Sequence, residues 1–286
     1  MKNQTNIMNT NKNILSLTLA VLLALPLAVS ARVPKRIYLE KTRVACVGNS
    51  ITYGMQLADP TTESYPAQLQ QMLGDGYEVG NFGKSGATLL RHGHRPYVEQ
   101  EEWAKAKAFK GDIAVIHLGV NDTDPRNWPF YRDEFVSDYL ALIDTLRQQN
   151  PKCRVLIALL SPITHNHPRF ESGTQQWHEE IQEAIKTVAR VGKAQLIDFH
   201  KPLYAYPQLL PDAVHPNKEG ATMLARTVCA AILGNYGGLQ MPMTYSDNMV
   251  LQRDHELTIH GTANSGERVT VSITRPDAAK GKSANG

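Results

Sequence analysis

Short apolar runs alternate with segments of helical periodicity along most of this 286-residue chain. The runs are continuous, as in strands buried on both faces; they are Val44–Val47, Tyr77–Phe82, Asp112–Leu118, Arg154–Leu160 and Ala194–Phe199. Apolar residues at helical spacing or helix boundary signals predict helices at Ser64–Gly74, Tyr131–Gln149, Trp177–Val191 and Lys218–Leu233. Alternating strands and helices predict an α/β fold, in which a parallel sheet carries helices on both faces.

Candidate chemical residues follow these strands. Gly48 ends the first run and Ser50 lies two residues further on, while a glycine-rich turn with Gly83 and Gly86 follows the second run and Asn121 follows the third. Ligands of open α/β sheets bind at the carboxyl edge of the strands. We therefore expect these residues to lie at one edge of the sheet.

A carboxylate and an imidazole, Asp212 and His215, lie three residues apart in the proline-bounded loop P-D-A-V-H-P-N. A serine nucleophile needs a base within hydrogen-bonding reach, and that base needs a group that orients it. We read Ser50 as the nucleophile, His215 as the base and Asp212 as its partner. The stretch G-N-S-I-T lacks the second glycine of a G-x-S-x-G elbow, which argues against an α/β-hydrolase.

Four blocks in the order Ser, Gly, Asn and Asp-x-x-His resemble the SGNH/GDSL hydrolase family over Arg43–Leu233. The resemblance implies a flavodoxin-like sheet and assigns the same roles to Ser50, His215 and Asp212. It also implies an oxyanion hole formed by the N–H groups of Ser50 and Gly86 and the amide of Asn121, with Gly83 as an alternative to Gly86. The first block reads G-N-S-I instead of G-D-S-L, which leaves the subfamily and substrate open.

Composition changes at both ends of the chain. Residues 1–31 have a weakly basic start, an apolar run and small residues near Ala31, as in a secretory signal peptide, with a membrane anchor as the alternative. We expect the hydrolase domain at 32–236 and an incomplete β module at 237–286. Three sequence segments of this module resemble the amino-terminal β region of sialate O-acetylesterases, namely Y-S-D-N-M-V-L-Q-R-D, H-G-T-A and G-E-R-V-T-V. A generic β module would share such turns.

Charge and residue types exclude several other classes. Charged residues make up 20% of the chain and hydrophobic ones 42%, which fits a globular protein and argues against a membrane-embedded or disordered one. The formal charge of +3 comes without a basic stripe, so we expect no nucleic-acid partner.

His92 and His94 form an H-x-H pair without a third ligand at useful spacing, and we expect a solvated loop and no metal or other cofactor. The three cysteines are expected to form no structural disulfide.

These observations predict an exported carboxylic ester hydrolase, periplasmic or secreted, that removes O-acetyl groups from carbohydrates. Its expected partner is an O-acetylated glycan or sialic acid, and no stable membrane insertion is expected after signal removal. The carboxyl-terminal resemblance favours a sialate O-acetylesterase. The alternatives are a lipid-directed esterase or lysophospholipase, an acetylxylan-type esterase, and a glycan-binding protein without turnover.

Overall fold

The computed structural model describes residues 40–239, 241, 261, 263–264 and 267–271. Five strands form one parallel sheet in the order β2-β1-β3-β4-β5. The strands are β1 (Thr42–Gly48), β2 (Tyr77–Gly83), β3 (Ile113–His117), β4 (Arg154–Leu159) and β5 (Gln195–Asp198). The central strands β1, β3 and β4 are largely buried, as their continuous apolar runs predict. The α/β fold is confirmed.

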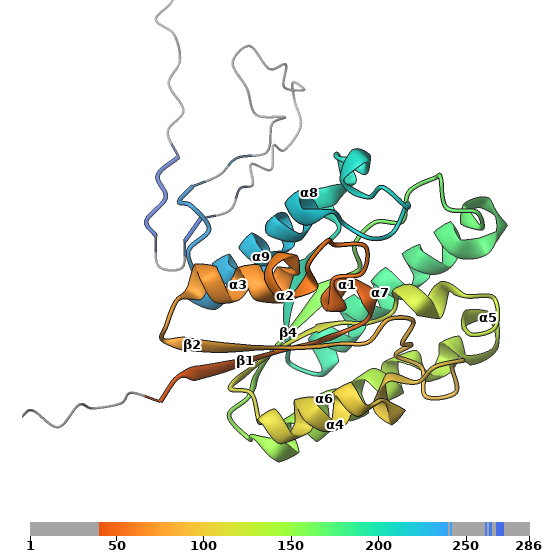
Figure 1. The fold of residues 1–286 in the computed structure, drawn as a ribbon, viewed down its shortest axis with the longest axis horizontal. Coiled ribbons are helices and arrows are strands. Elements are labelled where there is room, and N and C mark those ends of the chain that lie inside the picture. The colour runs from red at the N-terminus through yellow and green to blue at the C-terminus, as the bar shows by residue number, and fades with distance from the viewer. Residues whose placement is uncertain (1–39, 240, 242–260, 262, 265–266, 272–286) are drawn as a thin grey trace, which may run out of the picture. The chain divides into compact units, whose positions relative to one another are not determined.

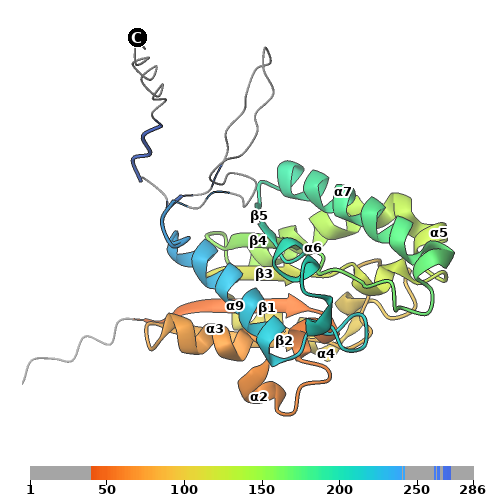
Figure 2. The ribbon, with the colours of Figure 1, turned by 90° about the horizontal axis from the view of Figure 1, so that it is seen from above.

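Helices cover both faces of this sheet (Figures 1 and 2). On one face α3 (Tyr65–Leu73) packs against α9 (Lys218–Leu233). On the other face lie α4 (Glu101–Phe109), α6 (Phe135–Gln149) and α7 (Gln175–Val191). The apolar stripe of α6 is buried, which accounts for its helical spacing of apolar residues.

Several short elements were not predicted. The helix expected from Tyr131 begins at Phe135 instead, because α5 (Trp128–Tyr131) and a 3₁₀ turn (Arg132–Glu134) occupy the preceding residues. The helix α4 was not predicted either, and only Trp103 and Ala106 are buried in it. Further four-residue helices are α1 (Ser50–Tyr53), α2 (Pro60–Glu63) and α8 (Lys201–Tyr204).

The terminal predictions lie mostly outside the described residues. This holds for the whole signal peptide, 1–31, and for most of 237–286, where the described residues are in neither helix nor strand. The proposed domain boundaries therefore stay predictions. Within the described part, no helix is long and apolar enough to cross a membrane. All three cysteines, Cys46, Cys153 and Cys229, are described and unpaired.

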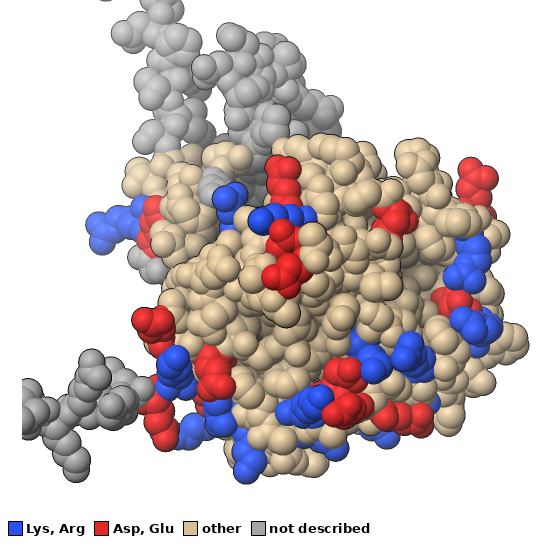
Figure 3. Space-filling view, viewed as in Figure 1, with Lys and Arg blue, Asp and Glu red and all other residues tan. Residues whose placement is uncertain are grey.

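Basic and acidic side chains are interspersed on the face drawn in Figure 3. On that face they form mixed groups and no continuous basic stripe. Among the described residues, Lys84 pairs with Glu102 and Lys218 with Glu63.

Candidate active site

Ser50 is presented by a tight turn between β1 and α1. A Cβ at Gly48 would clash with the side chain of Thr52 and with the backbone oxygen of His117, so the turn requires glycine there. Asn49 caps α1, since its Oδ1 accepts a hydrogen bond of 3.0 Å from the N–H of Ile51. As the first residue of α1, Ser50 has an N–H without an intrahelical partner. The turn therefore places a hydroxyl and a free backbone donor at the carboxyl edge of the sheet.

The loop before α9 brings an imidazole to this hydroxyl. The Nε2 of His215 lies 2.8 Å from Ser50 Oγ, and its Nδ1 lies 2.6 Å from Asp212 Oδ2. The other carboxylate oxygen of Asp212 accepts hydrogen bonds from the N–H groups of His215 (2.7 Å) and Val214 (3.1 Å). Three residues from two distant parts of the chain thus form one hydrogen-bonded line.

The carboxylate of this line is held in its ionised form. Burial alone would raise the pKa of Asp212, but the hydrogen bonds from the backbone and ring of His215 and from Val214 lower it below its usual value. The loop itself is tight, with Ala213 at a φ of 75° and its carbonyl accepting a 2.9 Å hydrogen bond from Thr164. Asn217 then caps α9 through Gly220 N–H, so the imidazole lies between two fixed points.

The predicted oxyanion donors lie on the same cavity. Ser50, Gly86, Asn121 and His215 all line a cavity of about 370 Å³. The Nδ2 of Asn121 donates a 2.9 Å hydrogen bond to the carbonyl of Ala87, which leaves its second amide hydrogen for another acceptor. Gly86 has a φ of 76°, in the left-handed region. Gly83 does not line the cavity, and a Cβ there would collide with the backbone of Tyr53.

Other residues of this cavity were not singled out from the sequence; they include Met55, Arg126, His167 and Arg169. Nearby Asp124 also lines the cavity and is only 7% exposed. Its carboxylate pairs with Arg126 (2.8 Å) and Arg169 (3.2 Å). The hydrogen bonds from Arg126, assisted by the charge of Arg169, hold the pKa of Asp124 far below its usual range despite partial burial.

Two further polar residues of the Asn block support the fold. Buried Asp122 accepts hydrogen bonds from the N–H groups of Leu89 (2.9 Å) and Leu90 (2.8 Å), which anchors the segment after Gly86. His117 is buried at the end of β3. Neither Asp122 nor His117 lines the cavity.

The histidines of the H-x-H pair have separate surroundings. His92 pairs with Glu134 at 2.7 Å, and His94 is held by Asn127 and lines the cavity. Both histidines are exposed on a loop, as expected, and His94 in addition faces the cavity. Within the described residues, no group of three or more His, Cys, Asp or Glu side chains is arranged to hold a metal ion.

The fold and the geometry define a class: an open parallel sheet whose carboxyl edge carries a hydrogen-bonded Ser-His-Asp line beside a cavity with amide donors. Residues 46–223 match the model of the GDSL-like Lipase/Acylhydrolase family, and the chain belongs to this family. This confirms the family predicted from the motif order and its class, the carboxylic ester hydrolases.

Individual relatives agree with this assignment. An acetylxylan esterase of Xylanibacter ruminicola is 38% identical over 206 residues, which cover 66% of this chain and 43% of that protein. The chain thus spans less than half the length of this curated relative. The fold resembles that of a crystallised acetyl xylan esterase (TM-score 0.52, 22% identity, 66% of this chain and 99% of that one). It also resembles a carbohydrate acetylesterase from Sinorhizobium meliloti (TM-score 0.51, 19% identity, 68% and 99%).

Proposed function

We propose that this protein is a serine esterase that removes acetyl groups from carbohydrates through an acyl-enzyme. The observation that carries the proposal is the line Ser50 Oγ, His215 Nε2, His215 Nδ1 and Asp212 Oδ2, with distances of 2.8 and 2.6 Å, at the wall of one cavity. In this geometry a hydroxyl, a base and an orienting carboxylate are already within hydrogen-bonding distance.

In the first half of the proposed reaction, His215 takes the proton of Ser50 Oγ as this oxygen attacks the carbonyl carbon of the acetyl ester. The tetrahedral intermediate collapses, and His215 delivers the proton to the leaving sugar oxygen. In the second half a water molecule loses a proton to His215 and attacks the acetyl-serine. Acetate leaves and the proton returns to Ser50. Asp212 keeps His215 oriented and stabilises its cation in both halves.

The negative oxygen of each tetrahedral intermediate needs donors that point at it. The N–H groups of Ser50 and Gly86 and the second amide hydrogen of Asn121 are proposed for this task. Removal of one such donor typically costs about 3 to 4 kcal/mol of barrier lowering. The hydrogen bond from Asn121 to Ala87 supports the proposal, because it fixes the orientation of the amide.

For the substrate we propose an acetylated xylan-type polysaccharide. Support comes from the 38% identical acetylxylan esterase, although this chain spans only part of that protein. The cavity of about 370 Å³ is lined by polar and charged residues, among them Arg126, His167 and Arg169, which suits a sugar ester better than a long acyl chain. The leader at 1–31 supports export to the periplasm or the medium.

A sialic acid ester is the second candidate. Arg126 and Arg169 both reach the cavity and share a single carboxylate, Asp124, so one positive charge is left for an acidic sugar. Arginine suits such a carboxylate because its planar guanidinium binds both oxygens. The carboxyl-terminal resemblance to sialate O-acetylesterases also supports this candidate, and it lies almost entirely outside the described residues.

A substrate panel tests the proposal. Release of acetate is measured from acetylated xylo-oligosaccharides, O-acetylated sialic acid and a phospholipid at equal ester concentration. We expect the highest kcat/KM for the xylo-oligosaccharides. A preference for the sialic acid ester would move the assignment to the second candidate, and a preference for the phospholipid would overturn the carbohydrate proposal. If no ester is turned over, the remaining alternative is a glycan-binding protein without catalytic activity.

A further inference from the structure

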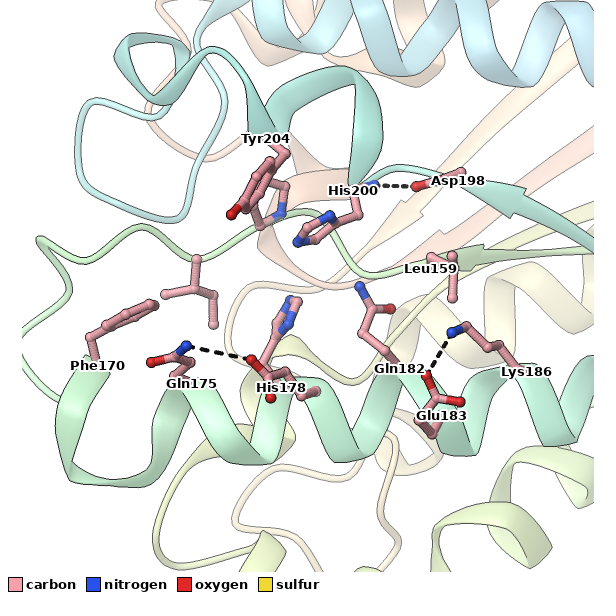
Figure 4. A pocket seen from close by; sticks show the side chains of 13 residues that line it. Leu159, Phe170, Gln175, His178, Gln182, Glu183, Lys186, Asp198, His200 and Tyr204 are labelled. Atoms are coloured by element: carbon pink, nitrogen blue, oxygen red, sulfur yellow. Dashed lines mark hydrogen bonds and ion pairs between the residues drawn. The ribbon is translucent and has the colours of Figure 1, made fainter. Parts of the chain in front are cut away.

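A second cavity, of about 430 Å³, lies beside the candidate active site (Figure 4). It is formed by the carboxyl ends of β4 and β5, by α7 and α8, and by the segment 162–170. That segment also lines the first cavity through His167 and Arg169, and Ile163 lines both cavities. The two cavities are therefore neighbours on either side of one stretch of chain.

An aromatic platform stands at the rim of this second cavity. Tyr204 is 71% exposed and stacks on His200, with ring centroids 5.0 Å apart and an angle of 26° between the planes. In Figure 4 both rings project from α8 and the turn before it toward α7, where Phe170 lies at the end of the cavity. An aromatic ring with one supported face and high exposure suits the apolar face of a sugar ring, while its hydroxyl can bond to a sugar hydroxyl.

The floor of the cavity is fixed by hydrogen bonds to the backbone. Gln182 accepts from the N–H of Leu160 (2.8 Å) and donates to its carbonyl (3.1 Å). The Nε2 of buried His178 lies 2.9 Å from the carbonyl of Ser161 and donates to it. These contacts tie α7 to the end of β4, so the cavity is a formed site with a rigid base.

Other polar groups of the cavity have no partner among the described residues. These are the hydroxyl of Tyr204, both ring nitrogens of His200, Oδ2 of Asp198 and Oε2 of Glu179. The opposite oxygens of the two carboxylates are engaged, since Asp198 Oδ1 caps α8 and Glu179 Oε1 accepts from Gln175. Unpaired donors and acceptors beside apolar lining residues such as Ile163 and Phe170 are what a ligand with many hydroxyl groups requires.

The charge of the cavity favours a neutral ligand. Burial lowers the pKa of His178 to about 4 and also lowers the pKa of His200, so both rings are neutral at pH 7. Lys186 is paired with Glu183 at 2.6 Å, which leaves the carboxylates of Glu179 and Asp198 without a cation at the cavity. An anionic sugar or a phosphate would be repelled here.

We infer that this second cavity binds a neutral sugar unit of the polysaccharide, one that lies along the chain from the acetylated unit in the active site. The inference rests on the proposed function for the position of the ester, and its ligand is a neutral pyranose or a short neutral oligosaccharide. Tyr204 stacks on the sugar ring, and Asp198 and Glu179 accept hydrogen bonds from its hydroxyls. The site gives the enzyme a preference for polymers over small esters.

The kinetic test compares Tyr204→Ala with Tyr206→Ala. Tyr206 is also exposed and lies two residues away, but it does not line the cavity, so it is a matched control. The substrates are 4-nitrophenyl acetate and acetylated xylo-oligosaccharides of one to six units. For the wild type we expect kcat/KM to rise with chain length. In Tyr204→Ala we expect kcat/KM for the longest oligosaccharides to be about tenfold lower than in the wild type, through a higher KM, which is equivalent to about 1.4 kcal/mol. The rate on 4-nitrophenyl acetate should stay the same.

A binding measurement separates this inference from the proposed function. Calorimetric titration with unacetylated xylotetraose needs no turnover, and Tyr204→Ala should weaken the binding about tenfold while Tyr206→Ala leaves it unchanged. Equal losses in both variants, or none in Tyr204→Ala, would overturn the inference. So would a selective loss for 4-nitrophenyl decanoate, which would make the cavity an acyl-chain site. If no ester is hydrolysed, the titration alone decides.

Discussion

Two sets of histidines lie at the carboxyl edge of the sheet, and their surroundings differ. His215 bridges a hydroxyl and a carboxylate and lines the first cavity. His117 and His178 instead contact the backbone of Ser161 from either side: its N–H donates to Nε2 of His117 (3.2 Å), and its carbonyl accepts from Nε2 of His178 (2.9 Å). Neither of these two has a carboxylate hydrogen-bonded to its ring among the described residues.

This difference decides what each ring can do. Burial lowers the pKa of His117 to about 3 and that of His178 to about 4, so both rings stay neutral at ordinary pH and hold the strand end in place. An imidazole that must accept a proton during a reaction needs a partner that stabilises its cation, and of these three rings only that of His215 has a carboxylate partner within the described structure. The three histidines thus show how the environment, more than the residue type, separates a candidate base from structural groups.

The largest expected effect comes from Ser50→Ala. The substitution removes the proposed nucleophile, and we expect kcat for 4-nitrophenyl acetate to fall by about 10⁵-fold or more. The fold should be retained, because the side chain of Ser50 makes its hydrogen bond only to His215 within the described structure. Circular dichroism and the melting temperature serve as controls. Substantial remaining activity with an intact fold would refute the assignment of the nucleophile.

Asp212→Asn turns His215 into a ring without a carboxylate, like His117. We expect kcat to fall by about 10³ to 10⁴-fold, because the ring loses its orientation and the stabilisation of its cation. The amide oxygen can still accept from the N–H groups of Val214 and His215, so the loop should keep its shape. The measurement is kcat for 4-nitrophenyl acetate together with thermal unfolding. A loss below tenfold would show that His215 works without this partner.

Much of this site could be predicted from the sequence, because its residues come directly after strand ends. The continuous apolar runs identify the strands, and Ser50, Gly86 and Asn121 follow three of them. The two-residue spacing between Asp212 and His215 suits a tight loop. The structure brings Ser50, Gly86, Asn121 and His215 to one cavity and hydrogen-bonds Asp212 to His215, while their roles stay proposals.

The other residues that line the two cavities could not be predicted from the sequence, because their positions depend on the conformations of loops and short helices. Arg126 and Arg169 come from separate loops and meet only through Asp124. Tyr204 lies in a four-residue helix that is too short for a periodic pattern. The helix α4 could not be predicted from periodicity either, because only two of its residues are buried and it has hardly any apolar stripe.

The smallest expected effect concerns His117, one of the two structural histidines, and the pH dependence of stability. His117 is buried beside Phe199, with ring centroids 5.1 Å apart, and cannot take up a proton until the pH approaches 3. The unfolded chain takes it up near pH 6.5, so between these values the unfolded state binds more protons and the free energy of unfolding falls as the pH falls. The contribution of one such histidine is at most about 1.4 kcal/mol per pH unit.

His117→Gln removes this contribution and keeps an acceptor for Ser161 N–H. Urea unfolding at pH 7, 6 and 5 should therefore show a shallower loss of stability in the variant than in the wild type, by about 1 kcal/mol per unit. Burial raises the pKa of Asp122 to about 6, which acts in the opposite direction, but this group is common to both proteins and cancels. The same substitution at exposed His165 controls for the change of residue. Parallel curves for His117→Gln and the wild type would mean that His117 can be protonated in place, and the contrast with His215 would then rest on the carboxylate alone.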